Sequence, residues 1–414
     1  MTEPIIIVCA LLLIAYLFDL WADRIKVPSV VLLLLLGWLT RQAVAWLGMR
    51  TPDLDALLEL FGTVGLILIV LEGALELELD ESKVKLVVKT FLAALLPMLA
   101  LAFGFAGVMS AVGDVSFPFT LVNVVPLCVI SSAIAIPTAA ALSRADREFV
   151  IYESSFSDIL GVLFFNFVLL NETVTFQSVG VFCSQLLVMV AISLAANVGL
   201  AFLLNKIEHH TKFVPIILMV ILIYAISKIW HLPALLFILL FGLFLGNFDQ
   251  LKHFRGLRML HPERLEGEIL RFKELTIEAT FLVRSLFFIL FGYLIETDEL
   301  LDAETLPWAA AVVAGIFLLR ALVMKALGMR LGPVLWLAPR GLITILLFLS
   351  IPAARRVPLV NRSLIIQVII LTALGMMAGL MVTGGAKKTP PQGDAGPARQ
   401  PPCDGNSALT KTAA

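Results

Sequence analysis

Long apolar runs separated by short polar stretches dominate the chain, and their lengths predict its secondary structure. About twenty apolar residues in a row are enough for a helix to cross the hydrocarbon core of a bilayer. Several of the polar stretches carry proline or glycine, which end helices. The runs predict thirteen membrane-spanning helices, at about residues 4–22, 28–47, 57–79, 86–112, 118–143, 149–171, 175–205, 213–229, 232–248, 274–296, 306–328, 333–352 and 362–384.

Three segments at the ends or between the runs have their own patterns. The first apolar stretch, Ile5–Trp21, meets charged residues without a small-residue cleavage site, which predicts a retained helix rather than a signal peptide. The longest polar connection, 247–273, mixes acids, bases and leucines, so we expect a cytoplasmic amphipathic helix that links two halves. Residues 385–414 hold almost no large apolar side chain, which predicts a disordered cytoplasmic tail.

Two of the predicted spans are interrupted. Span 118–143 contains Pro126 and Pro137, and span 333–352 contains Pro339-Arg340-Gly341. Paired broken helices in corresponding positions of two halves indicate an inverted-repeat transporter with its site near the bilayer midplane. Backbone carbonyls freed by such breaks face a cavity or an ion. The pattern therefore predicts an all-α polytopic membrane protein with two broken helices that cross.

Composition and charge distribution strengthen this interpretation. Of the 414 residues, 60% are apolar and 15% charged, and the mean hydropathy is +1.00, which excludes a soluble protein. When the predicted loops are assigned to alternate sides, eighteen lysines and arginines fall on one side and six on the other. Positive residues gather on the cytoplasmic side. We expect a plasma (inner) membrane protein with its N-terminus outside and its C-terminus in the cytoplasm.

Enzyme chemistry has no support in the sequence. We find no nucleophile–base pair, metal-ligand cluster or phosphate-binding glycine loop, and the four cysteines lack metal or disulfide spacing. We therefore expect a protein that is not an enzyme and needs no cofactor. Its expected partners are membrane lipid and the transported ions, and no nucleic acid.

Asp158 is the strongest candidate for a functional group. A charged side chain inside a membrane span is costly and by default marks a functional site. At about 100° per residue, Ser154 lies on the same helix face as Asp158, and Ser157 is adjacent. Carboxylate and hydroxyl oxygens suit a small metal cation, and the carboxylate accepts a proton when the cation leaves. Competition of cation and proton for Asp158 would couple their transport; the alternative is an aspartate merely hydrogen-bonded in a helix bundle.

A second set of charges has a different expected role. Glu153 lies roughly 140° around the helix from Asp158 and faces another neighbour. Arg320 occupies a span that holds no other charge before Lys325, and a buried guanidinium needs an acid. We predict a structural ion pair between Glu153 and Arg320. Arg340 either satisfies the freed carbonyls or stands in for a cation where the broken helices meet.

Three further charged residues in the spans keep two interpretations each. Glu72, near the end of the third span, either adds an oxygen to the ion site or supports the site indirectly. Glu278 and Arg284 share the tenth span, where each is either a polar packing residue or a functional one.

Four motifs in order give the chain a family resemblance. They are Leu71-Glu72-Gly73 followed by Leu75-Glu76-Leu77, Glu153-Ser154-x-x-Ser157-Asp158, Leu318-Leu319-Arg320, and Arg340-Gly341. Together they resemble the monovalent cation:proton antiporter superfamily, most closely its electroneutral sodium/proton exchanger branch, over about residues 5–384.

The resemblance implies a fold and roles for residues. It implies an inverted-repeat homodimer, with core helices at about 86–171 and 306–384 and dimerisation or scaffold helices at about 1–79 and 175–296. The broken helices would cross near the ion site, and the core would move like an elevator. Asp158 would carry the ion and the proton, Ser154 and Glu72 would assist, and Glu153 would pair with Arg320.

Two positions depart from the family pattern. Ser157 stands where the exchanger branch has Asn and the electrogenic branch a second Asp, so we expect one-for-one exchange without net charge. The broken fifth span has Ala135-Ile136-Pro137-Thr138 where the family often has Thr-Asp-Pro. We expect Ser131, Ser132 or Thr138 to replace the lost ligand.

The sequence thus predicts an electroneutral exchanger of a monovalent cation, Na⁺ before K⁺ or Li⁺, for H⁺. One alternative is a transporter of the same fold that moves an organic anion, or another cation, which an arginine-lined cavity from Arg284 and Arg340 would favour. Another is a membrane sensor or scaffold that transports nothing.

Overall fold

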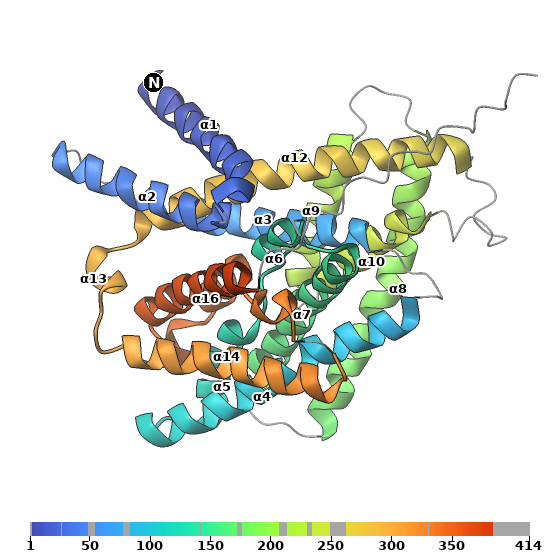
Figure 1. The fold of residues 1–414 in the computed structure, drawn as a ribbon. Coiled ribbons are helices and arrows are strands. Elements are labelled where there is room, and N and C mark those ends of the chain that lie inside the picture. The colour runs from blue at the N-terminus through green and yellow to red at the C-terminus, as the bar shows by residue number, and fades with distance from the viewer. Residues whose placement is uncertain are drawn as a thin grey trace, which may run out of the picture.

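A computed structural model describes residues 2–25, 27–48, 54–77, 83–140, 142–171, 176–206, 213–229, 234–248, 262–329 and 331–383. Helices and no strands make up the secondary structure of these residues (Figure 1). The α-helices are α1 Thr2–Ile25, α2 Ser29–Trp46, α3 Asp55–Glu76, α4 Val84–Gly113, α5 Phe117–Cys128, α6 Ser132–Ala139, α7 Arg144–Leu170, α8 Phe176–Lys206, α9 Phe213–Ile229, α10 Ala234–Gly246, α12 Pro262–Leu294, α13 Thr297–Leu300, α14 Leu306–Ala326, α15 Leu342–Leu349 and α16 Arg362–Val382. Two 3₁₀ helices, η2 Pro333–Trp336 and η3 Ala353–Arg355, flank α15.

Each predicted span coincides with one helix or with a broken pair. The span 118–143 is divided into α5 and α6, and the span 333–352 into η2 and α15. Within the described ranges, nine helical segments are long and apolar enough to cross a membrane when α5 and α6 are counted together as Phe117–Ala139. Three apolar segments are shorter: Ile5–Trp21 within α1, Phe213–Ile229 and Ala234–Gly246. The count of thirteen crossings stays a prediction.

Part of the predicted connection 247–273 is continuous with the tenth span. The helix α12 begins at Pro262 and continues to Leu294, and the role of 247–273 as a cytoplasmic linker stays a prediction. Between these ends only Gly267 weakens the helix, and a single glycine is tolerated. Residues 249–261 and the predicted disordered tail lie outside the described residues.

The helix α12 crosses the molecule against α2 and α3, and α10 packs between α3 and α8 (Figure 1). Glycines allow these helices to approach closely. A Cβ atom on Gly37 of α2 would lie 2.7 Å from the Tyr293 nitrogen of α12. A Cβ on Gly246 would lie 2.8 Å from the Leu75 carbonyl oxygen of α3. Larger residues at either position would push the helices apart.

The helix α7 lies at the centre of a second group. It contacts α4, α5 and α6, and also α3, α10 and α15. The helix α14 packs on α4 and α16, and η2 packs on both α14 and α16. Because α7 has neighbours on most sides, its polar residues between Tyr152 and Asp158 are buried. The division into core helices 86–171 and 306–384 and scaffold helices 1–79 and 175–296 stays a prediction.

Candidate ion-binding site

The two interrupted segments meet at their breaks. The helix α5 ends at Cys128 and α6 begins at Ser132, while η2 ends at Trp336 and α15 begins at Leu342. The Ser131 N–H donates a hydrogen bond to the Pro339 carbonyl, at 2.9 Å. A Cβ atom on Gly341 would lie 2.8 Å from the Ser131 hydroxyl oxygen, so a glycine is needed where the segments cross. The crossing brings the ends of several short helices to one place inside the protein.

Arg340 neutralises one side of this crossing. Its side chain is buried, and its Nε and Nη2 donate to the carbonyls of Leu127 and Cys128 at 2.7 and 3.2 Å. Its Nη1 donates to the Ala338 carbonyl at 2.9 Å. The last carbonyls of a helix carry partial negative charge and lack helical partners, so a cation there is stabilising. Arg340 thus caps the C-terminus of α5, the first of the two roles expected for it.

Asp158 faces the start of α6, on the other side of the break from the end of α5 that Arg340 contacts. The Ser132 hydroxyl donates to Oδ2 of Asp158, and the Ser132 backbone N–H also faces the carboxylate. Ser132 is the first residue of α6, whose N-terminus favours a negative charge. Asp158 is 2% exposed, and its Oδ1 has no hydrogen-bond partner among the described residues. One carboxylate oxygen is therefore held, and the other is open to a ligand.

A small cavity adjoins Asp158. The Ser155 hydroxyl faces it and, within the described part of the chain, has no hydrogen-bond partner. The remaining lining is mostly apolar and comes from α3, α6, α7 and α10: Ile69, Val70, Gly73, Ala74, Ser132, Ile159 and Leu239. Sequence reasoning missed Ser155. Its spacing of three residues from Asp158 was a usable signal, because residues three and four apart share a helix face.

Other predicted hydroxyls have different partners. The Ser154 hydroxyl donates back to the Val150 carbonyl at 2.7 Å. The Ser157 hydroxyl accepts the N–H of Ile130 at 2.9 Å, so it holds α7 to the break after α5.

The last predicted residues lie on and next to α6. The Thr138 hydroxyl donates to the Ile134 carbonyl at 2.7 Å, and Pro137 beside it is exposed. The Ser131 hydroxyl is buried without a partner in the described structure. Of the predicted hydroxyl residues, all within the described ranges, Ser132 is the one whose hydroxyl donates a hydrogen bond to Asp158.

Glu153 and Arg320 form a bidentate ion pair. The Arg320 Nη1 and Nη2 atoms donate to Oε1 and Oε2 of Glu153 at 2.6 and 2.7 Å. Nη2 also donates to the Val334 carbonyl of η2, at 2.9 Å. The side chains of Arg320 and Glu153 are 2% and 1% exposed. The pair ties α7 to α14 and η2, and Glu153 faces away from Asp158.

Glu72 lies on a different side of α3 from the small cavity. It is half-buried and faces Arg284 and Thr280 of α12, with Glu76 and Lys273 nearby. It does not line the cavity beside Asp158.

Glu278 and Arg284, the two residues of the tenth span with two interpretations each, have different surroundings. Glu278 is exposed on α12. Arg284 is half-buried and contacts the Ala133 carbonyl of α6.

Comparison with known proteins identifies the family. A family model described as sodium/hydrogen exchanger, transmembrane, matches residues 9–384. The chain belongs to this family. It is therefore a multi-pass membrane transporter and not an enzyme, and its family supports exchange of a cation for a proton.

Solved structures of one exchanger have the same fold. The sodium proton antiporter MjNhaP1 from Methanocaldococcus jannaschii, at pH 8, aligns with a TM-score of 0.64 and 19% identity, covering 92% of this chain and 98% of that chain. A second structure of MjNhaP1, from an electron-microscopy map, gives a TM-score of 0.63 and 18% identity, covering 92% and 95%. A search of curated proteins found no match.

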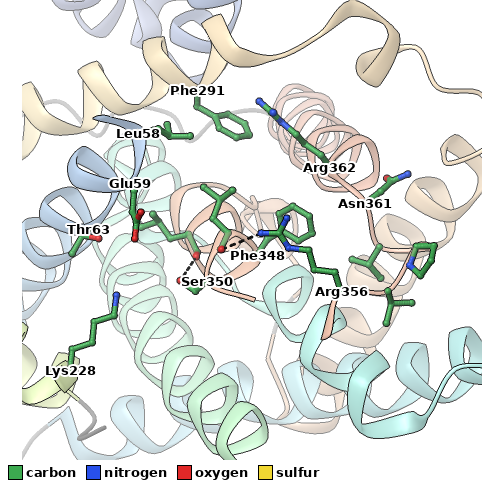
Figure 2. A pocket seen from close by; sticks show the side chains of 15 residues that line it. Leu58, Glu59, Thr63, Lys228, Phe291, Phe348, Ser350, Arg356, Asn361 and Arg362 are labelled. Carbon is green, nitrogen blue, oxygen red and sulfur yellow. Dashed lines mark hydrogen bonds between the residues drawn. The ribbon is translucent and has the colours of Figure 1, made fainter. Parts of the chain in front are cut away.

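A larger cavity of about 690 Å³ lies at the C-terminal end of α15 (Figure 2). Figure 2 shows Lys228 and Glu59 toward one side and Arg356 and Arg362 toward the other. Arg356 donates to the carbonyls of Ile351 and Leu349 at 3.2 and 3.5 Å. Arg362 donates to the Leu294 carbonyl at 2.8 Å. These arginines therefore satisfy carbonyls near the ends of α15 and α12.

The helix α3 lines both the large cavity and the small one beside Asp158. Leu58, Glu59 and Thr63 line the large cavity, and Ile69 is the first α3 residue beside the small one. Six residues of α-helix correspond to roughly 9 Å along the axis. The α3 residues Leu66, Ile67 and Leu68 fall within this length of helix, and all three are apolar and buried.

Proposed function

We propose that the chain exchanges a monovalent cation, Na⁺ first among them, for H⁺, with Asp158 binding either the cation or the proton. The observation that carries the proposal is that Asp158 and Ser155 line one small cavity, and that Oδ1 of buried Asp158 and the Ser155 hydroxyl have no hydrogen-bond partner among the described residues. Carboxylate and hydroxyl oxygens are the ligands that hard cations prefer. The N-terminus of α6 stabilises the ionised carboxylate that remains with the cation.

We propose further that exchange is electroneutral. Asp158 is the sole acid among the described residues that line the small cavity. Glu153 is neutralised by Arg320, and Glu72 faces Arg284 on α12. A single carboxylate that holds either one cation or one proton moves no net charge in a full cycle.

The proposed exchange requires a route to Asp158 from each side of the membrane. The large cavity contains Lys228, Arg356 and Arg362, which the positive-inside assignment places on the outer side. We propose that it is the outer route, closed from Asp158 by the layer around Leu66. Movement of the core helices against the scaffold helices of a homodimer would open this route and the cytoplasmic one in turn.

The organic-anion alternative has less support. It requires an arginine-lined cavity from Arg284 and Arg340. Arg340 donates to three carbonyls at the crossing and is 1% exposed. Its guanidinium is therefore already occupied.

The test uses proteoliposomes that contain a pH dye, with Na⁺, Li⁺ or K⁺ added outside and the membrane potential clamped at several values. We expect a Na⁺-driven pH change that is indifferent to potential. Asp158→Asn abolishes it, while Asp146→Asn, at a half-buried aspartate in the first turn of the same helix, retains it. A response that follows the potential contradicts electroneutrality. No response to any cation contradicts the proposed exchange and favours the anion or scaffold alternatives.

A further inference from the structure

The half-helix α6 has a backbone carbonyl that its own helix cannot fully satisfy. In an α-helix the carbonyl of residue 133 accepts from the N–H of residue 137. Residue 137 is Pro137, which has no N–H. The α-helical bond to the Ala133 carbonyl is therefore missing, one residue after Ser132, the residue that holds Asp158.

Arg284 supplies a donor to this carbonyl. Its Nη1 lies 3.4 Å from the Ala133 oxygen and donates to it from α12. The contact joins the long helix α12 to the half-helix α6, two elements separated by more than a hundred residues. A guanidinium suits the position, because its several N–H groups serve a carbonyl and a carboxylate at once.

Glu72 of α3 lies near the same guanidinium. Their opposite charges attract, and Thr280, one turn earlier on α12, also lies near Glu72. Glu76 and Lys273 are the other charged groups nearby. Arg284 thus lies between an acid on α3 and the N-terminal turn of α6.

We propose that Arg284 is a positioning residue for cation binding. By joining Glu72 to the carbonyl freed by Pro137, it fixes the first turn of α6 and with it the Ser132 hydroxyl against Asp158. This inference rests on the proposed exchange at Asp158. It also gives Glu72 its role, which is to anchor Arg284 instead of binding the ion.

The first experiment compares Arg284→Gln with wild type in the proteoliposome assay. Loss of one charge-assisted hydrogen bond corresponds to about a tenfold effect on binding. We expect Arg284→Gln to raise the Na⁺ concentration for half-maximal exchange about tenfold, with a smaller change in maximal rate. Arg284→Lys, which keeps the charge, recovers part of the affinity. Arg271→Gln, at an exposed arginine on the same helix, serves as the matched control and leaves the affinity unchanged.

The second experiment tests the link to Pro137. Pro137→Ala restores the N–H at position 137, so the Ala133 carbonyl no longer depends on Arg284. In a Pro137→Ala background, we expect Arg284→Gln to weaken the Na⁺ affinity by about threefold or less, instead of about tenfold. The effect is smaller because the hydrogen bond from Arg284 to the Ala133 carbonyl is no longer needed. An equal effect in both backgrounds overturns the link through the carbonyl.

The outcomes separate this inference from the proposed function. Wild type that does not exchange ions contradicts the proposed function. Wild type that exchanges, with Asp158→Asn inactive and both Arg284 variants unchanged in Na⁺ affinity, contradicts the positioning role alone. If too little Arg284→Gln protein is recovered, the Arg284→Lys variant is used instead. The inference is overturned if Arg284→Lys leaves the Na⁺ affinity unchanged both with Pro137 and with Pro137→Ala.

Discussion

The Glu153–Arg320 pair gives a prediction whose size follows from its contacts. Arg320→Gln removes two short hydrogen bonds to the carboxylate and one to the Val334 carbonyl. Because Glu153 is 1% exposed, water cannot replace these donors. Removing one partner of a buried ion pair costs about 3–5 kcal/mol, since the other charge is left unpaired.

The double variant Glu153→Gln/Arg320→Gln leaves no unpaired charge. We expect it to be less destabilised than either single variant, with about 3 kcal/mol of coupling between the two positions. With an unfolding entropy of about 2 cal/mol/K per residue over 414 residues, each single change lowers the melting temperature by roughly 3–6 °C.

The assay is thermal unfolding of detergent-purified protein, followed by intrinsic fluorescence. Arg144→Gln is the matched control, because exposed Arg144 pairs with half-buried Glu148 on α7, the helix of Glu153, and ion pairs open to solvent contribute little. If the double variant melts as low as the sum of the two single effects, the two side chains do not stabilise each other and the reasoning is refuted.

Three further predictions concern the site. Ser132→Ala and Ser155→Ala each raise the Na⁺ concentration for half-maximal exchange by about tenfold, since each removes one oxygen near Asp158, and unchanged affinity in both would exclude these hydroxyls. Gly73→Val abolishes exchange but not folding, because a Cβ atom there already lies 3.2 Å from the Ser155 hydroxyl and larger groups fill the small cavity; active, Na⁺-responsive protein would refute this placement. Arg340→Gln lowers the melting temperature by roughly 3–6 °C through loss of the C-cap of α5, and an unchanged melting temperature would mean that water serves those carbonyls equally well.

The positions of the helices could be predicted from the sequence because runs of apolar residues, prolines and glycines are local signals. Pro126, Pro137 and Gly341 marked both breaks, since each removes a donor or allows a close approach. The pairing of Glu153 with Arg320 was also predictable, because a buried guanidinium requires an acid.

Contacts that depend on helix rotation were not predictable. Ser154 and Ser155 both lie near the Asp158 face of α7, and only the neighbouring helices decide which of them faces the cavity. The two interpretations of Glu72 could not be separated from the sequence, because neighbouring helices decide its rotation on α3, which brings it near α12. The contact of Arg284 with Ala133 joins residues far apart in the chain, and no local pattern indicates it.

The most direct test of the account is the number of protons released per Na⁺ bound. Purified protein in weakly buffered detergent solution is titrated with NaCl at a series of pH values, and proton release is followed with a soluble pH dye. Competition at one carboxylate predicts a maximum of one proton per Na⁺ bound, and no release from Asp158→Asn. A maximum of two protons, or release that persists in Asp158→Asn, would contradict the claim that Asp158 alone exchanges the cation for the proton.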